Sequence, residues 1–374
     1  MAYIDQFFQY LITAGASDLH LGEGQPPKIR RHGDVMPIRE ELLSHEEIEF
    51  MLHEICGAKG WATFLERGDF DFAYEMNDEA RFRCNYLKQT NGYGAVFRLI
   101  PTKIATLEQL GIPPVVKEFG NIRGGIVLVT GPTGSGKSTT LAALIDYINT
   151  NFNRHIITIE EPIEFVHVNK KSIITQREVP EHAATFPVGL KAALREDADI
   201  VLVGEMRDLE TISLALTAAE TGLLVFGTLH TNNARKTVDR LIDVFPSDQQ
   251  SQVRTMLSAS LRGVVAQLLL KKTPEAGGGR VAVNEILVST NAVSAIIREG
   301  ATQKLQDVIV GGKGLGMQFM DDAIWFHLQQ GNISPHEAFM KAIDKSRFRP
   351  FLPPEEQDLG NSAGGGPEDK TKKK

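Results

Sequence analysis

The chain has 374 residues, of which 42% are hydrophobic and 23% are charged, and this length suits two globular domains better than one. Its formal net charge of −7 argues against nucleic acid as the main partner, because binding to phosphate backbones favours a basic face. The two cysteines, Cys56 and Cys84, lie far apart and have neither metal-binding nor disulfide-framework spacing. The sequence therefore predicts a reducing, cytoplasmic location.

No segment of the chain predicts membrane insertion. Residues Met1–Asp5 contain no basic segment followed by an apolar run, so we expect no signal peptide there. The longest apolar stretches, Ile126–Val129 and Gly263–Leu270, are too short to span a bilayer. Any action on a membrane machine is therefore expected to come through docking.

Residues 1–100 predict a small mixed α+β domain. The expected helices are Ile4–Thr13 and Ser44–Cys56, and the expected strands are Ser17–Leu21, Lys28–Arg31, Val35–Ile38, Phe70–Tyr74, Ala80–Leu87 and Gly94–Ile100. Ser44 stands three residues before Glu47, which predicts a capping box at the start of the second helix. The proline-containing stretch 101–122 predicts a linker.

From residue 123 to 350 the pattern becomes that of an α/β domain with a parallel sheet. Short apolar runs predict buried strands at Ile126–Thr130, His155–Glu160, Ile200–Gly204 and Leu223–Leu229. Helical patterns cover Ser138–Thr150, Leu209–Thr221 and Gln249–Leu270, and most of the chain beyond Ile286. Residues 351–374 are rich in Pro, Gly, Glu and Lys and predict a disordered tail.

A phosphate-binding motif follows the first strand of this domain. The run from Gly131 to Ser138 fits G-x-x-x-x-G-K-[ST] and stands between a predicted strand and a predicted helix, a context that disfavours the alternative of a simple glycine-rich turn. Its glycines let the backbone wrap an anion, and the helix start adds its positive end. Lys137 would contact the β- and γ-phosphates of ATP, and the Ser138 hydroxyl would bind Mg²⁺. The expected binding residues are Gly131, Pro132, Thr133, Gly134, Ser135, Gly136, Lys137, Ser138 and Thr139.

Three further strands end in acidic residues or a histidine. Glu205 follows an apolar strand, which is how a P-loop protein delivers a carboxylate to its metal ion. Glu160, Glu161 and Glu164 lie within five positions, so their charges repel unless they are solvated, paired or near a metal. His230 follows another buried strand. The alternatives from the residues alone are an exposed strand-end acid, a solvated acidic loop and a structural histidine.

Taken together, these four strand ends resemble the motifs of the secretion and pilus ATPase superfamily, and most closely its type IV pilus twitching-motility retraction ATPases (PilT/PilU type). The matching motifs are Gly131–Thr139 (Walker A), Glu160–His167 (Asp box), Ile200–Thr211 (Walker B and the residues after it) and Gly227–Thr231 (His box). Gln176–Val179, Asp243–Pro246, Leu315–Gln318 and Ser17–His20 also look like this subfamily. The resemblance covers about residues 5–345.

The resemblance implies roles for individual side chains. Glu164 would be the general base for water, Glu205 would hold Mg²⁺ through water, and His230 would couple nucleotide state to a neighbouring subunit. Arginines of the N-terminal domain, at Arg81, Arg83 and Arg98, would reach the phosphates and neutralise developing charge. Arg195 and Arg207 also match the family pattern.

The resemblance also implies an architecture and partners. It implies a PAS-like N-terminal domain followed by a RecA-like domain with C-terminal helices, and a homohexamer that hydrolyses ATP to retract a pilus. The expected partners are an inner-membrane pilus platform protein, reached by docking at the cytoplasmic face, and a paralogous pilus ATPase.

Other functions stay open at this point. Ser294 stands where retraction ATPases carry an arginine, which keeps open an accessory or regulatory ring acting beside a main motor. A nucleic-acid translocase is disfavoured by the acidic balance and by the absence of an aromatic-plus-basic run. A kinase of small substrates would use the P-loop but would not explain the N-terminal domain.

Overall fold

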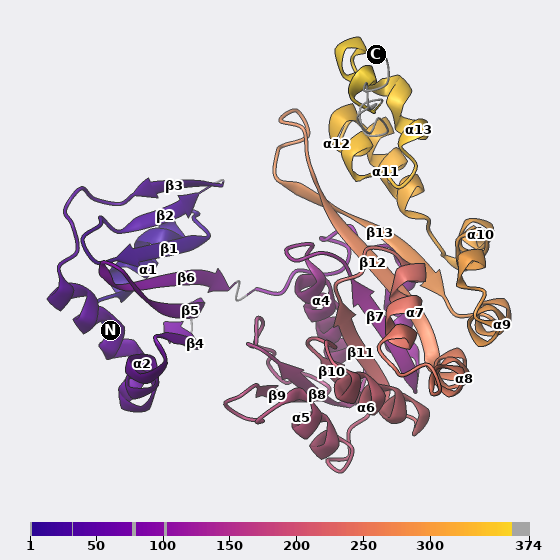
Figure 1. The fold of residues 1–374 in the computed structure, drawn as a ribbon, viewed down its shortest axis with the longest axis horizontal. Helices are drawn as coiled ribbons and strands as arrows, with labels where there is room; N and C mark the ends of the chain where they lie inside the picture. The colour runs from indigo at the N-terminus through magenta and orange to yellow at the C-terminus, as the bar shows by residue number, and fades with distance from the viewer. Residues whose placement is uncertain (1, 32, 77–79, 101–102, 361–374) are drawn as a thin grey trace, which may run out of the picture. The chain divides into compact units, whose positions relative to one another are not determined.

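The computed structural model describes residues 2–31, 33–76, 80–100 and 103–360, and its chain contacts form two compact units (Figure 1). Unit 1 comprises Met1–Ile104, Thr158–Asn169 and Ile174–Gly189; unit 2 comprises Ala105–Ile157, Lys170–Ile173 and Leu190–Lys374. Among the described residues, no helix is both long enough and apolar enough to cross a membrane.

Unit 1 contains a six-stranded antiparallel sheet with the order β3-β2-β1-β6-β5-β4. Its strands are β1 Asp18–Gly22, β2 Lys28–Arg31, β3 Asp34–Pro37, β4 Asp69–Met76, β5 Ala80–Gln89 and β6 Gly92–Ile100, and its N-terminal helices are α1 Asp5–Thr13 and α2 His45–Arg67. The core is aromatic, because Phe8 of α1 stacks on Phe82 of β5 with ring centroids 4.0 Å apart. The expected capping box is confirmed at Ser44 and Glu47.

A second sheet has seven strands in the order β13-β12-β7-β11-β10-β8-β9, and its strands β7 and β10 to β13 lie in unit 2. The strands are β7 Gly125–Thr130, β8 His155–Glu160, β9 Ile173–Glu178, β10 Ile200–Val203, β11 Leu224–Leu229, β12 Leu261–Lys271 and β13 Arg280–Val288. The pairs β7–β11, β10–β11 and β7–β12 are parallel, and β12–β13 is antiparallel. The parallel α/β pattern expected from residue 123 is therefore confirmed.

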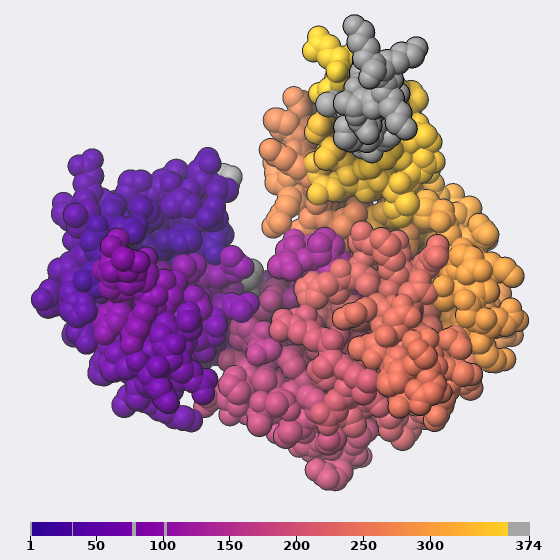
Figure 2. All heavy atoms as spheres, in the orientation of Figure 1, coloured from indigo at the N-terminus to yellow at the C-terminus, as the bar shows by residue number. Residues whose placement is uncertain are grey.

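The helices of this part lie before, between and after these strands in the chain. They are α3 Val115–Glu118, α4 Lys137–Asn151, α5 Phe186–Ala193, α6 Leu209–Glu220, α7 Ala234–Asp243, α8 Gln250–Ser260, α9 Asn291–Glu299, α10 Leu305–Gly311, α11 Met320–Gln329, α12 Pro335–Lys341 and α13 Lys345–Phe348. Leu270 of β12 and Val283 of β13 share a small core with Met320, Ile324 and other residues of the last helices. In Figure 2 the orange atoms of this hairpin region therefore lie against the yellow atoms of the last helices.

Two expectations for the α/β part of the chain differ from the structure. The expected helix Gln249–Leu270 ends at Ser260, and Leu261–Lys271 is strand β12, because this apolar run is buried between β7 and β13. Residues 105–122, expected as a linker, pack within unit 2, where Leu107, Val116 and Phe119 are buried.

The C-terminal end begins in ordered structure. In place of the expected disorder after residue 350, Pro354–Gly360 forms a 3-10 helix, and the Phe351 ring lies 5.0 Å from that of Trp325. The rest of the expected tail, residues 361–374, and the expected hairpin residue His32 lie outside the described residues.

Candidate nucleotide-binding site

The P-loop joins the end of β7 to the start of α4 and has a backbone that only glycine adopts freely. Gly131, Gly134 and Gly136 have φ angles of 147°, 76° and 85°. A Cβ atom on Gly131 would lie 2.3 Å from the Gln267 carbonyl oxygen. Lys137 Nζ donates to the carbonyl oxygens of Gly131 (2.9 Å) and Pro132 (3.2 Å). The lysine therefore lies across the mouth of its own loop, where an anion would be bound.

One buried hydroxyl in this loop lacks a protein partner. Ser135 is only 3% exposed, and its Oγ has no hydrogen-bond partner among the described residues. Buried polar atoms in native structures almost always have a partner. A phosphate oxygen bound in the loop is a group that would satisfy this hydroxyl.

A pocket of about 610 Å³ adjoins the start of α4. Its lining includes Gly136, Thr139 and Thr140 on one side and Leu269 and Arg280 from β12 and β13 on another. This volume falls within the range of small-molecule and cofactor sites. The P-loop therefore opens beside a cavity large enough for the nucleoside part of a nucleotide.

The parallel sheet brings three of the expected strand ends to one edge. Thr130 pairs in register with Leu229, so the P-loop and His230 begin side by side, and Gly131 N donates to Leu229 O at 3.3 Å. Val203 of β10 pairs with the neighbouring strand β11, which places the start of the Glu205 segment at the same edge. This arrangement follows from parallel pairing alone, because parallel strands all end on the same side.

Glu205 is the centre of a charged cluster at this edge. Its Oε1 lies 2.8 Å from His230 Nε2 and 2.5 Å from Arg207 Nε, and Arg207 Nη2 donates to Oε2 at 2.6 Å. Burial raises the pKa of Glu205, but the hydrogen bond and charge of Arg207, with His230, outweigh it and hold the pKa below its usual value. Glu205 is therefore an ionised carboxylate at neutral pH.

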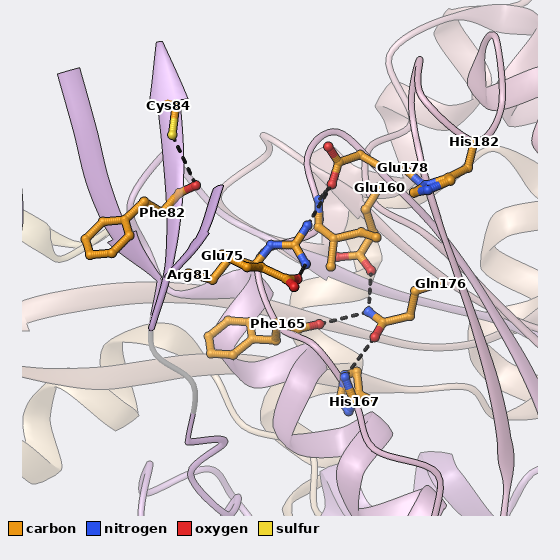
Figure 3. A network of polar contacts seen from close by, with 11 residues as sticks. Glu75, Arg81, Phe82, Cys84, Glu160, Phe165, His167, Gln176, Glu178 and His182 are labelled. Carbon is orange, nitrogen blue, oxygen red and sulfur yellow. Dashed lines mark hydrogen bonds and ion pairs between the residues drawn. The ribbon is translucent and has the colours of Figure 1, made fainter. Parts of the chain in front are cut away.

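The loop that carries Glu164 is held by two side chains of β9 (Figure 3). Ile163 N donates to Glu178 Oε2 at 3.1 Å, and Gln176 Nε2 donates to Phe165 O at 2.8 Å. These bonds fix the backbone immediately before and immediately after Glu164. The motif Gln176–Val179, which the sequence analysis noted without a role, therefore positions the acidic loop.

The three N-terminal arginines share one face of the unit 1 sheet. Arg83 of β5 lies directly opposite Arg98 of β6, and Arg81 is two residues from Arg83 on the same strand. Asp18 of β1 lies opposite Arg98 in turn, and its Oδ1 accepts from Arg98 Nε at 2.8 Å. This face therefore carries three arginines, and Arg98 forms an ion pair with Asp18 on it.

Arg81 is engaged by two carboxylates (Figure 3). Its Nη1 donates to Glu75 Oε1 at 2.8 Å and its Nη2 to Glu178 Oε2 at 3.2 Å. Glu178 thus contacts both Arg81 and the loop of Glu164. Arg195, the remaining expected site arginine, is exposed after the end of α5 in unit 2. The catalytic roles expected for these arginines stay predictions.

Sequence reasoning did not identify Gln267 and Asn284, and it noted Gln318 only as part of a motif without a role. These three residues bond in series next to the P-loop. Gln267 lies inside an apolar run that had been expected to be helical, so its direction toward the P-loop could not be inferred. The signal available was a single amide within the run Leu261–Leu270, since a lone polar residue in a buried strand needs a partner.

Glu160, the last residue of β8, is a half-buried acid. Its pKa is raised from 4.5 to about 7, mainly by burial and also by the charge of Glu164. Hydrogen bonds, including one from Gln176, oppose this rise. The native state therefore binds a proton between pH 4.5 and about 7 that the unfolded chain has released. The free energy of unfolding falls as pH rises through this window.

We expect Glu160→Gln to remove this pH dependence. The amide does not titrate, so the variant should match the wild type near pH 5 and be more stable at pH 8. Thermal unfolding without nucleotide checks this. At pH 8, each kcal/mol added to the free energy of unfolding should raise the Tm by about 2–4 °C. Glu161→Gln, at the exposed neighbouring position, is the control. The same Tm difference at both pH values would contradict the assigned pKa.

With this geometry described, comparison with known proteins identifies the family. Residues 2–315 match the family described as Type II/IV secretion system protein. This chain belongs to the type II/IV secretion system protein family. A relative from Pseudomonas aeruginosa, the type IV pilus retractation ATPase PilT, is 50% identical over 345 residues, which cover 92% of this chain and 99% of the relative.

Two further members of the secretion system family are informative. The type IV pilus ATPase PilU of Pseudomonas aeruginosa is 38% identical over 345 residues, covering 92% of this chain and 90% of the relative. A crystal structure of the pilus retraction motor PilT with bound ADP has a TM-score of 0.85 and 41% identity, and covers 93% of this chain and 98% of that one. The α/β fold and the resemblance inferred from the sequence motifs are confirmed.

Proposed function

We propose that this protein is an ATP-hydrolysing motor that drives type IV pilus retraction. The observation that carries the proposal is the P-loop beside the cluster of Glu205, Arg207 and His230, in a chain that aligns with PilT over nearly its whole length. The crystal structure of PilT contains ADP, which supports a nucleotide in the pocket next to Thr139.

The residues of the site fit a magnesium ion bound together with ATP. Mg²⁺ keeps several waters and is usually held by one or two protein groups plus substrate phosphates. The Ser138 hydroxyl and the Glu205 carboxylate, which Arg207 and His230 keep ionised, would hold it. The bound ion offsets the charge that develops on the transferred phosphoryl group.

The protein side chains have separate tasks in this proposal. The P-loop backbone and Lys137 bind and orient the phosphates, and the buried Ser135 hydroxyl donates to one of their oxygens. Glu164 accepts the proton of the attacking water. His230, which contacts Glu205 directly, couples nucleotide state to a neighbouring subunit in this proposal. Arg81, Arg83 and Arg98 neutralise phosphate charge, and Arg195 and Arg207 are assigned to the same site by the family pattern.

The proposed assembly is a homohexamer that docks on an inner-membrane pilus platform protein at the cytoplasmic face. We assign residues 1–100 to a PAS-like domain, 123–350 to a RecA-like domain with C-terminal helices and 351–374 to a tail; residues 105–122, which pack within unit 2, belong with the RecA-like domain rather than to a free linker. The sheet orders of the two compact units support a separate N-terminal module and a P-loop module.

An accessory or regulatory ring, acting beside a paralogous pilus ATPase, is the second candidate. Ser294 supports it, because this half-buried position on α9 carries an arginine in retraction ATPases. The higher identity to PilT (50%) than to PilU (38%) supports the main motor.

The test is phosphate release from Mg-ATP by the purified protein, with particle mass measured in the same buffer. A motor gives steady turnover by a particle of about six chains, and Glu205→Ala abolishes that turnover. A hexamer that binds ATP without turnover would favour the accessory ring, and reversion of Ser294 to arginine would then be the next variant. Turnover stimulated only by single-stranded DNA would contradict both candidates.

A further inference from the structure

The P-loop is held from behind by one buried amide. Gln267 of β12 is 2% exposed, and its Nε2 donates to Ser135 O at 2.7 Å while its Oε1 accepts from Thr140 Oγ1 at 2.8 Å. Ser135 belongs to the loop and Thr140 to the first turn of α4. A single side chain thus ties the loop to the helix that it begins.

This amide is the first member of a longer series. Its Oε1 also accepts from Asn284 Nδ2 on β13 at 3.0 Å, and Asn284 is 1% exposed. Gln318 Nε2 donates to Asn284 O at 2.8 Å, and the Gln318 backbone exchanges hydrogen bonds with Ile286 of the same strand, at 2.8 and 3.0 Å. Gln318 stands two residues before Met320, the first residue of α11. A continuous series of hydrogen bonds therefore joins the P-loop to the start of α11.

The P-loop packs so closely against Gln267 that it cannot shift unless Gln267 shifts with it. Built Cβ atoms on Gly131 and Gly136 would lie 2.3 Å from Gln267 O and 2.9 Å from Gln267 Nε2. A buried polar group that loses its partner is strongly disfavoured. A shift of the loop on binding phosphate would therefore be transmitted to Asn284 and Gln318, rather than absorbed locally.

We propose that Gln267 is a positioning residue of the P-loop, and that Gln267, Asn284 and Gln318 couple nucleotide binding to the start of α11. This inference rests on the proposed nucleotide site. It gives a role to the motif Leu315–Gln318, which the catalytic assignment leaves unused. Because coupling is reciprocal, the state of α11 then sets the affinity of the P-loop for nucleotide.

The first experiment measures ATP hydrolysis by the full-length Gln267→Met variant, which keeps the side-chain volume but removes both hydrogen-bonding atoms. We expect an increase in KM for ATP of about tenfold or more, because a loop with unpaired groups no longer holds the binding conformation. The change in kcat should be smaller. A variant with unaltered KM would overturn the positioning role, and one that lowers Tm and kcat with KM unchanged would assign Gln267 to packing alone.

The second experiment tests the coupling at its far end, where the half-buried Gln318 tolerates substitution better. Amide hydrogen exchange is measured with and without Mg-ADP in the wild type, in Gln318→Met and in the control Gln329→Met. Gln329 is exposed at the last position of α11, the helix that begins two residues after Gln318. In the wild type and the control, ADP should slow exchange both in the P-loop and in residues 316–322.

In Gln318→Met, ADP should protect the P-loop but no longer protect residues 316–322, and ADP affinity should fall several-fold. Equal protection of residues 316–322 in this variant and in the wild type would overturn the coupling while leaving the nucleotide site intact. Absence of P-loop protection in the wild type would overturn the nucleotide site itself, so the two failures are distinguishable.

Discussion

Replacing Glu164 by glutamine is expected to lower kcat for ATP hydrolysis by about 10²–10⁴-fold, the contribution typical of a general base. The amide has nearly the same shape as the carboxylate but cannot accept a proton from water. The loop backbone should stay in place, because Glu178 and Gln176 hold the residues on both sides of position 164. Nucleotide affinity should therefore be close to that of the wild type.

The measurement is single-turnover phosphate release, with affinity for a fluorescent ADP analogue measured in parallel. Glu161→Gln provides a matched control, since it removes an exposed carboxylate from the same loop. The control should keep its turnover within a few-fold of the wild type. Comparable losses in both variants would mean that the negative charge of the loop matters rather than a base at Glu164, and full activity in Glu164→Gln would remove the assigned role.

The nucleotide site was predictable because its signals are local in sequence. The P-loop needs glycines at fixed spacing, and parallel strands end at one edge of their sheet. Once the strands were recognised, Gly131, Glu205 and His230 could therefore be predicted to lie close together. His230 contacts Glu205 at this edge, and its role in coupling stays a prediction.

The strands β9, β12 and β13 show why the rest was not predictable. Apart from Arg262 and Gln267, the run Leu261–Leu270 is apolar, so its periodicity cannot separate a buried strand from a buried helix. Its strand conformation depends on β7 and β13, which lie far from it in the sequence. Likewise, the side chains of Gln176 and Glu178 bond to backbone atoms of a distant loop, and such contacts leave no pattern in composition or spacing.

The same limit applies to the Gln267 series. An amide in an apolar run signals that a partner exists, but the partner is a carbonyl of the P-loop 132 residues away. Only the parallel pairing of β12 with β7 sets Ala266 opposite Thr130, which places the next residue, Gln267, beside the start of the loop. The polar contacts that position the site therefore come from sheet topology rather than from the motifs themselves.

Replacing Gly131 by alanine is expected to lower ATP affinity by at least about tenfold, through backbone strain and overpacking of a few kcal/mol. The new methyl group would lie 2.3 Å from Gln267 O and 2.6 Å from Ser135 Oγ, at a φ of 147°. The loop must move away from β12 to admit it. Isothermal titration with Mg-ADP and thermal unfolding would measure the loss of affinity and of stability.

Gly134→Ala is the matched control for the close approach. Gly134 also has a positive φ, 76°, but a Cβ there would meet nothing within 4 Å. It therefore incurs only the left-handed backbone strain of about 1–2 kcal/mol, without collision. A clearly larger loss of affinity in Gly131→Ala would show that the contact with Gln267 sets the conformation of the loop. Equal losses would show that backbone strain alone accounts for both, and that β12 does not constrain the phosphate cradle.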